Sequence, residues 1–387
     1  MKIKSIQQKT VSLNSEIRNA VIDFSTMTTS IVAVVTDVVK NGKPVVGFGF
    51  NSNGRYAQEG ILKERIIPRL LSADRDALLN NAGDNLDPFK CWDVMMKNEK
   101  PGGHGDRSVA VGTVDMAIWD IVAKIENKPL YKLLSERYRD GKAKPEVYTY
   151  AAGGYYYPGK ALTGLLDEFK RYLDMGFESC KMKIGGASLN EDLARIEAAL
   201  KIVGKGSALA VDANGRFDLR TAVKYAEAIE PFGLKWYEEP VDPLDFQSLA
   251  ALSESSKMSL ATGENIFSLP DSRNLILYGN LNPNRDYLQM DPVLGYGLTE
   301  YIRILNMLKE KGWSSKRCIP HGGHQFGLHI AAGLELYGNE SYPEVFLPFG
   351  KFSDNMKLEN GIIKLNSAPG IGYETVEEIY TIFKQLL

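Results

Sequence analysis

The chain has 387 residues, of which 44% are apolar and 24% charged, and its formal net charge is −2. These values predict a globular protein with enough core for two structural units. Without an excess of positive charge, we expect it to bind neither nucleic acid nor a membrane surface. Its three cysteines are far apart and fit no disulfide or zinc pattern, which indicates a cytoplasmic protein. We expect no signal sequence and no membrane span, because no long apolar run occurs.

The first 140 residues predict an α+β unit. Alternating polar and apolar residues indicate strands over 3–13, 30–39 and 44–50. Asn41-Gly42 joins the last two strands and is a hairpin signal. The apolar residues then take on a helical period, so this part of the chain predicts a small antiparallel sheet packed against helices.

The helical part of this unit spans about 58–134 and is clearest over 109–125, where apolar residues recur every three or four positions. Pro129 marks a helix end. The last stretch, 373–387, predicts one more helix that folds back on the first unit. We therefore expect residues of about 365–387 to complete the first domain.

Residues 145–360 predict a second domain of the α/β class. Short apolar stretches are each followed by a helix-length amphipathic segment, which is typical of βα units. The eight expected strands are 147–152, 181–184, 208–212, 235–238, 259–263, 287–290, 317–320 and 345–347. Eight such units predict a closed barrel whose functional groups lie at the carboxyl ends of the strands.

Three acidic residues fall where successive strands should end. Asp212, Glu238 and Glu264 are each 26 residues, or one βα unit, from the next. Single acids at such positions are often helix caps. Three like charges at one end of a barrel are costly unless a cation lies among them. Carboxylate oxygens favour Mg²⁺, so we expect these three residues to bind it.

One strand earlier, Lys181 and Lys183 alternate with Met182. The period of two directs both lysines to the same side of the strand. A single lysine near a strand end is usually a surface residue. Two lysines inside the barrel beside a metal would lower each other's pKa, so that one amine could act as a base.

Asp291 and His321 lie at the ends of two later neighbouring strands. An aspartate that holds an imidazole sets its tautomer and raises its basicity, so we expect the pair to act as an acid or base. The other histidines are less informative. His329 lies in an expected helix and is interpreted as a satisfied core or surface residue, whereas His324 and His104 lie in glycine-flanked loops.

The segments KMK, VDANG, YEEP, TGEN, QMDP and PHGGH occur in order, after the helical segment TVDMAIWDIVAKIENKPLYKLL. Together they resemble the enolase superfamily, mandelate racemase subgroup, along nearly the whole chain. The resemblance implies an α+β N-terminal capping domain over a (β/α)₇β modified TIM barrel. It also implies a homo-oligomer and Mg²⁺ that stabilises an enediolate made from a carboxylate substrate.

The resemblance also assigns roles to the motif residues. It implies that Lys183 is a base with Lys181 beside it, and that His321 with Asp291 is the opposite acid or base. The same comparison of motifs makes Asp212, Glu238 and Glu264 the Mg²⁺ ligands.

Within the subgroup, the segments FNSNGRYAQ, KPGGHGDRS and HGGHQFGLHIAAGLELYGNESYPEVFLPFG are most similar to D-tartrate dehydratases. A hydroxylated diacid needs polar and cationic partners from the cap. The expected substrate-binding residues are Asn51, Asn53, Lys100, Arg107, His324 and Glu344. Near the eighth strand, Glu340 is an alternative to Glu344.

We therefore predict Mg²⁺-dependent dehydration of D-tartrate to oxaloacetate, with Lys183 as base and His321 as acid. Two alternatives use the same site: dehydration of another acid sugar, and racemisation or epimerisation in which His321 returns the proton to the same carbon. A protein that only binds a sugar acid is a different class. Exchange of the substrate alpha proton in D₂O would exclude that class.

Overall fold

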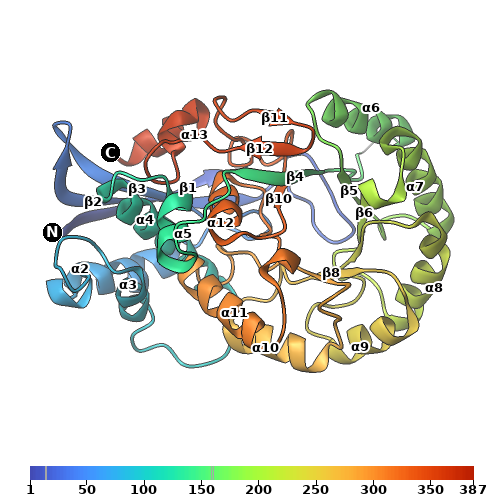
Figure 1. Cartoon of the computed structure of the whole chain (residues 1–387), viewed down its shortest axis with the longest axis horizontal. Coiled ribbons are helices and arrows are strands. Elements are labelled where there is room, and N and C mark those ends of the chain that lie inside the picture. The colour runs from blue at the N-terminus through green and yellow to red at the C-terminus, as the bar shows by residue number, and fades with distance from the viewer. Residues whose placement is uncertain (14, 158, 160) are drawn as a thin grey trace.

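The computed structural model describes residues 1–13, 15–157, 159 and 161–387 (Figure 1). The N-terminal part of the chain forms a three-stranded antiparallel sheet. Its strands lie in the order β1 (Ile3–Ser12), β2 (Thr28–Lys40) and β3 (Lys43–Phe50). Asn41 and Gly42 connect β2 to β3 with φ angles of 50° and 75°. Two positive φ angles are what a two-residue hairpin turn requires. The predicted sheet and turn are confirmed.

Helical segments follow the sheet and complete the cap. In chain order they are α1 (Glu59–Ile61), a π-helical turn (Leu62–Ile66), α2 (Ile67–Ser72), a 3₁₀ turn (Arg75–Ala77), α3 (Pro88–Met95), α4 (Asp106–Ile125) and α5 (Leu130–Tyr138). Pro129, expected at a helix end, lies in the break between the end of α4 at Ile125 and the start of α5. Its fixed φ of −62° is also compatible with a position at a helix start.

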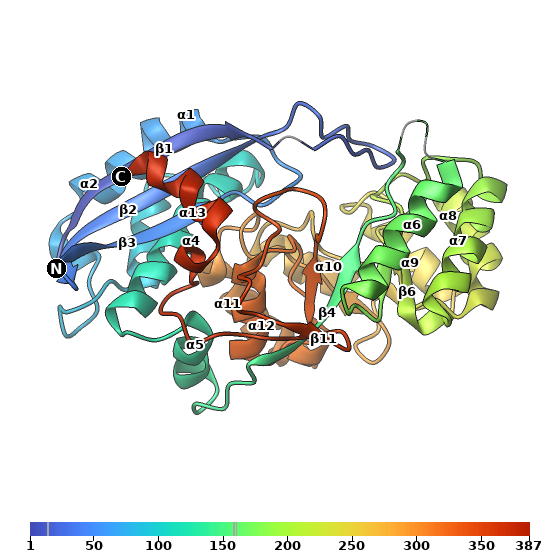
Figure 2. The same cartoon turned by 90° about the horizontal axis from the view of Figure 1, so that it is seen from above.

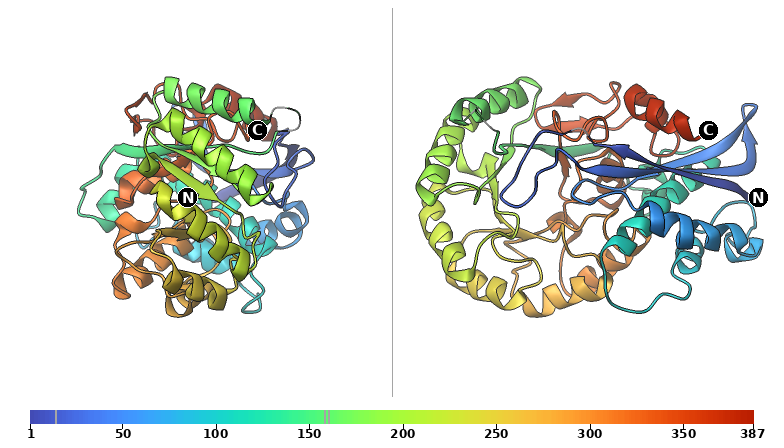
Figure 3. Two further views of the ribbon diagram at one scale, coloured as in Figure 1. Left: turned by 90° about the vertical axis from the view of Figure 1, so that its right-hand side faces the viewer. Right: turned by 180° about the vertical axis from the view of Figure 1, so that it is seen from behind.

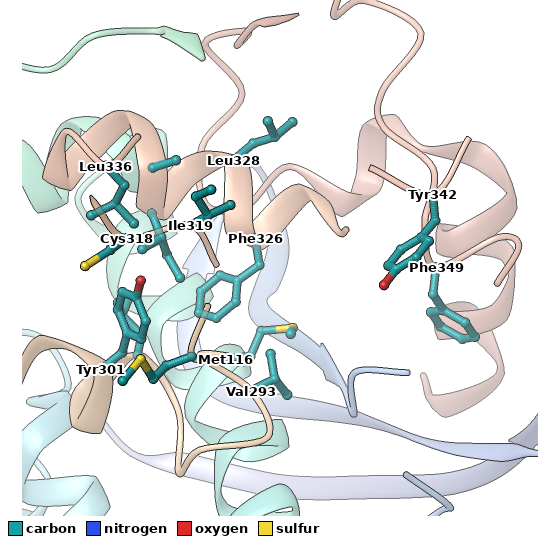
Figure 4. Packing of buried hydrophobic residues seen from close by; sticks show 14 of the residues in the cluster. Met116, Val293, Tyr301, Cys318, Ile319, Phe326, Leu328, Leu336, Tyr342 and Phe349 are labelled. Carbon is teal, nitrogen blue, oxygen red and sulfur yellow. The ribbon is translucent and has the colours of Figure 1, made fainter. Parts of the chain in front are cut away.

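Helix α4 is buried along nearly its whole length, because the sheet covers one face and the barrel another. Glycines allow the sheet and the barrel to approach α4 closely. A Cβ on Gly47 of β3 would lie 2.0 Å from the carbonyl oxygen of Ala117, and one on Gly112 would lie 1.8 Å from that of Val293. Figure 4 shows Met116 of α4 in the same apolar cluster as Val293 of the barrel. The helix therefore anchors the cap to the barrel.

The second domain is a barrel of parallel strands surrounded by helices (Figure 3). Its strands are β4 (Glu146–Ala152), β5 (Cys180–Lys183), β6 (Leu209–Asp212), β7 (Tyr237–Glu238), β8 (Leu260–Thr262), β9 (Tyr287–Leu288) and β10 (Asn339–Ser341). A single bridge from Leu288 to Cys318 marks the predicted strand between β9 and β10. Strand β10 pairs with β4 and closes the barrel.

Helices connect these strands in the predicted βα order. They are α6 (Ala161–Asp174), α7 (Leu189–Val203), α8 (Leu219–Ile229), α9 (Phe246–Ser255), α10 (Leu269–Tyr278), α11 (Leu298–Glu310) and α12 (Gln325–Leu334). The capped (β/α) barrel predicted from the sequence is therefore the fold of this chain. None of the helices in the described parts of the chain has the length and apolar character needed to cross a bilayer.

The last barrel strand differs from the prediction. Residues 345–347 form bends and a turn, and the strand is β10, where Asn339 pairs with Thr149. All three residues of β10 are polar, yet all are buried. Such a strand has no apolar run in its sequence, because its side chains are stabilised by partners inside the barrel rather than by apolar contacts.

The C-terminal segment returns to the cap sheet (Figure 2). After the hairpin β11 (Leu358–Glu359) and β12 (Ile362–Lys364), the chain forms a 3₁₀ turn (Tyr373–Thr375), α13 (Glu377–Phe383) and a second 3₁₀ turn (Lys384–Leu386). The predicted helix over 373–387 is thus one short α-helix between two 3₁₀ turns. The ring of Phe383 stacks on Phe48 of β3 with centroids 4.7 Å apart, which attaches this segment to the cap.

Candidate active site

Three carboxylates meet at the carboxyl ends of successive barrel strands. Asp212 ends β6, Glu238 ends β7, and Glu264 follows β8 by two residues. One oxygen from each lies within 4.8 Å of the other two. Asp212 and Glu238 are fully buried, where three negative charges repel one another unless a cation lies between them. This set of hard oxygen donors suits Mg²⁺ and leaves positions for water or substrate oxygens.

Both lysines of β5 point into the barrel beside these acids. Lys183 Nζ lies 2.5 Å from Asp212 Oδ2, and Lys181 Nζ lies 2.5 Å from Glu238 Oε1. Burial lowers the pKa of Lys183, but the negative charges of Asp212, Glu264 and Glu238 together raise it above its ordinary value. The positive charge of Lys181 lowers the pKa of Lys183, as expected, but this effect is smaller than the opposite effect of Asp212. By themselves, therefore, the carboxylates keep both amines protonated.

His321 is held by Asp291 on another side of the barrel. Its Nδ1 lies 2.8 Å from Asp291 Oδ2, while the other oxygen, Oδ1, accepts the backbone N–H groups of Val293 and Leu294. Burial opposes a charge on the imidazole, but Glu264, Asp291 and nearby acids raise the pKa of His321 to about 10. The imidazole is therefore a stable cation that can donate a proton from Nε2.

Glu340 of β10 connects the two sides of the site. Its Oε1 lies 2.7 Å from Lys181 Nζ, and its Oε2 accepts the backbone N–H of Gly322 and lies 3.8 Å from His321 Nε2. Glu344 instead pairs with Arg171 at 2.7 Å, outside this cluster. The structure therefore brings Glu340, the alternative, to Lys181 and His321, whereas Glu344 lies beside a separate cavity.

Two glycines after His321 shape this region. Gly322 and Gly323 have φ angles of 111° and 62°, which favour glycine. A Cβ on Gly323 would lie 2.1 Å from the ring of Tyr342. That ring carries a hydroxyl 3.4 Å from His321 Nε2. The PHGGH segment thus lets a buried phenol approach the imidazole.

A cavity of about 520 Å³ lies between the barrel mouth and the cap. Lys183, Glu264 and His321 line it from the barrel side. From the cap, Asn53, Arg55 and His104 line it, together with apolar residues that include Val21 and Phe24. Its size is typical of small-molecule sites. The site is therefore completed by both domains.

The other predicted substrate-binding residues lie in different surroundings. Asn51 is buried in its own loop, where its side chain bonds to the backbone of Ser30 and Arg55. His324 caps α12 by accepting the N–H of Gly327, and burial lowers its pKa to about 4. These two side chains organise loops next to the cavity but do not line it.

Lys100 and Arg107 lie farther from the chemistry. Lys100 is exposed and is not among the cavity-lining residues. Arg107 pairs with Glu99 and donates to the Tyr296 hydroxyl at the cap–barrel junction. Arg55 was not predicted, although it lies two residues after Asn53 in the same polar loop.

Tyr155 and Tyr342 also line the cavity and were not predicted. The Lys183 amine lies 5.3 Å from the centre of the Tyr155 ring. Tyr155 follows Gly153 and Gly154 directly after β4, so a tyrosine at the end of the first barrel strand was the available signal. Tyr342 follows β10, which the apolar pattern did not reveal.

Comparisons with known protein families cover both domains. The model described as the mandelate racemase / muconate lactonizing enzyme N-terminal domain matches residues 5–135. The model described as enolase C-terminal domain-like matches residues 164–379. The matched regions correspond to the cap and to most of the barrel.

Several of the individual similar proteins are dehydratases, and others are cycloisomerases. The arabinonate dehydratase of Saccharolobus solfataricus is 32% identical, over 91% of this chain and 90% of that protein. The L-talarate/galactarate dehydratase of Salmonella typhimurium is 27% identical, over 90% of this chain and 81% of that protein. The crystal structure of L-talarate dehydratase from Polaromonas sp. JS666, complexed with Mg and L-glucarate, covers 95% of this chain and 94% of that chain, with a TM-score of 0.72 and 26% identity.

Proposed function

The chain belongs to the mandelate racemase / muconate lactonizing enzyme group of the enolase superfamily, and on this basis we propose that it is a Mg²⁺-dependent dehydratase of an acid sugar. The observation that carries the proposal is the cavity shared by Lys183, Glu264 and His321. A base, a metal ligand and an imidazolium acid all border one space there. The names of the similar dehydratases support the same class of reaction.

D-Tartrate is our specific candidate substrate. It is a short diacid with a hydroxyl on each of its two inner carbons, and loss of water from it gives the enol of oxaloacetate. The resemblance of the segments FNSNGRYAQ and KPGGHGDRS to D-tartrate dehydratases supports this choice. Arabinonate and galactarate are the competing acid sugars, since the similar proteins bear those names.

In the proposed reaction, Lys183 removes the proton on the carbon next to the carboxylate. His321, steadied by Asp291, gives its Nε2 proton to the hydroxyl that leaves from the next carbon as water. The resulting enol then ketonises. Mg²⁺ held by Asp212, Glu238 and Glu264 would stabilise negative charge on the substrate carboxylate and offset the charges that keep Lys183 protonated. A positioned base of this kind adds roughly 10²–10⁴-fold to the rate.

Lys183 and His321 come from different parts of the barrel wall. Lys183 ends β5, whereas His321 follows the segment between β9 and β10. A base and an acid separated in this way favour anti elimination, in which the proton and the hydroxyl leave from opposite faces. The same placement also suits a racemase, in which His321 would return the proton to the first carbon.

The test is release of keto acid from D-, L- and meso-tartrate, arabinonate and galactarate, with Mg²⁺ and with a chelator. We expect metal-dependent turnover of one acid, lost in Lys183→Ala. Lys201→Ala removes an exposed lysine from α7 and serves as the matched control. Failure to turn over any acid would contradict a dehydratase.

Proton exchange in D₂O separates the alternatives. In a dehydratase, His321→Asn should still exchange the alpha proton through Lys183 but form little keto acid. Deuterium in unconverted diastereomers, without keto acid, would instead support a racemase or epimerase. Absence of exchange in the wild-type chain would support a protein that only binds the acid.

A further inference from the structure

Arg55 presents a positioned guanidinium to the cavity. Its NH1 donates to the carbonyl of Gly54 at 2.7 Å, and its NH2 donates to Asn265 Oδ1 at 2.6 Å. Its central carbon lies 4.9 Å from the centre of the Phe267 ring. These contacts use two of the five N–H donors of an arginine and fix the plane of the group. The remaining donors are available to a ligand.

The orientation of Asn265 follows from the chemistry of its neighbours. Its Nδ2 lies 2.9 Å from Glu239 Oε2 and 3.4 Å from Glu264 Oε1. Arginine only donates hydrogen bonds, so Oδ1 must face Arg55 and the amide nitrogen faces the acids. One side-chain amide therefore spans the distance between Arg55 and the metal-binding carboxylate Glu264.

Arg55 also lacks an acidic partner. Across the described residues, no carboxylate lies within the 4.0 Å of an ion pair from its guanidinium. The other basic groups that line the cavity have acids nearby: Lys183 has Asp212, His321 has Asp291, and His104 lies 4.0 Å from Asp271. A partly buried cation without a counter-ion in a ligand-sized cavity favours an anionic ligand group.

We infer that Arg55 binds a second carboxylate of the substrate and thereby selects dicarboxylic over monocarboxylic acids. This inference rests on the proposed function, in which the first carboxylate of the substrate lies beside Lys183 and the Mg²⁺ that Glu264 would help to hold. The planar fork of arginine matches both oxygens of a carboxylate. The single amide between Arg55 and Glu264 places the two anion-binding positions close together, which favours a short diacid such as tartrate.

The experiment compares D-tartrate with the threonate of the same configuration, which has CH₂OH in place of one carboxylate. Binding in the presence of Mg²⁺ is measured by calorimetry, and turnover by keto acid release. We expect the wild-type chain to prefer tartrate. Arg55→Gln should weaken tartrate binding about 10- to 100-fold, as expected for loss of a charged hydrogen-bonding partner, and change threonate binding less than about twofold.

The matched control is Arg216→Gln, which removes an exposed arginine from the loop after β6. It should leave both affinities unchanged. Mg²⁺ binding to Arg55→Gln, measured by the same titration, should equal that of the wild-type chain. If it does, an altered metal site does not explain the loss of tartrate affinity.

Two results would overturn the inference. The first is equal affinity of the wild-type chain for both acids, and the second is an equal loss of affinity for both acids in Arg55→Gln. The second result would leave Arg55 as a residue that only positions the loop. If the wild-type chain turned over neither acid, D-tartrate would fail as its proposed substrate. A tartrate preference in binding that depends on Arg55 would still support the inference in that case.

Discussion

Asp291 Oδ2 lies 2.8 Å from His321 Nδ1, and the other oxygen of Asp291 is held by two backbone N–H groups. The carboxylate is therefore fixed on both sides. Burial raises its pKa, but the contact with His321 outweighs this and lowers it. The pair is consequently a carboxylate and an imidazolium, with Nε2–H left as the proton to be donated.

Asp291→Asn tests this relationship. The amide can still accept the backbone N–H groups through its oxygen, so the loop should remain in place. Its NH₂ group would face Nδ1 and favour the neutral imidazole, which is a poor acid. We expect turnover to fall by at least about 100-fold, with Mg²⁺ affinity unchanged. Steady-state kinetics and metal titration measure both, and a fall of less than about threefold would contradict the assigned role.

Mg²⁺ should stabilise the fold through the three carboxylates. At a metal concentration about 100 times the Kd, binding to the native state adds about 2.7 kcal/mol to the free energy of unfolding. Thermal unfolding with Mg²⁺ and with a chelator should therefore give different Tm values. The difference should nearly vanish in Glu264→Gln and persist in Glu227→Gln, a substitution of an exposed acid on α8. The same difference in both variants would place the metal elsewhere.

Glu340 and Glu344 should differ sharply in their effects. Glu340→Gln removes a charge from a fully buried cluster with Lys181, and we expect turnover to fall at least about 100-fold. Glu344→Gln breaks a half-exposed pair with Arg171, which is worth at most about 1 kcal/mol. Its turnover should stay within about twofold. A large loss of turnover in Glu344→Gln alone would favour Glu344 as the substrate-binding residue.

Asp115 should make stability depend on pH. It joins α4 of the cap to Thr299 of the barrel, and burial raises its pKa from 3.8 to about 7. Between these pH values the native state binds a proton that the unfolded chain has released. The free energy of unfolding should therefore fall as the pH rises through this range.

Asp115→Asn should make this decline shallower, because the amide does not titrate. Urea unfolding at about pH 4.5 and pH 7.5, for the wild-type chain and the variant, measures the two slopes. Comparing the two chains cancels the contributions of other titrating groups. A variant slope equal to that of the wild-type chain would show that Asp115 does not titrate in this range.

The sequence alone predicted the features that depend on local patterns. Alternation placed Lys181 and Lys183 on the inner side of β5, since side chains on a strand alternate between its two faces. The spacing of 26 residues placed Asp212, Glu238 and Glu264 at the ends of successive strands. Because strand ends of a parallel barrel meet at one rim, these patterns also predicted the convergence of the acids.

Only the tertiary structure decided which distant groups meet. The polar strand β10 carries Glu340 into the barrel, where burial is compensated by partners far away in the sequence, so no apolar pattern marks it. The meeting of Arg55 with Asn265, and the exposure of Lys100, depend on how the cap packs on the barrel through α4. Local periodicity fixes the direction of a side chain within its own element, whereas contacts between the two domains depend on packing over long sequence separations.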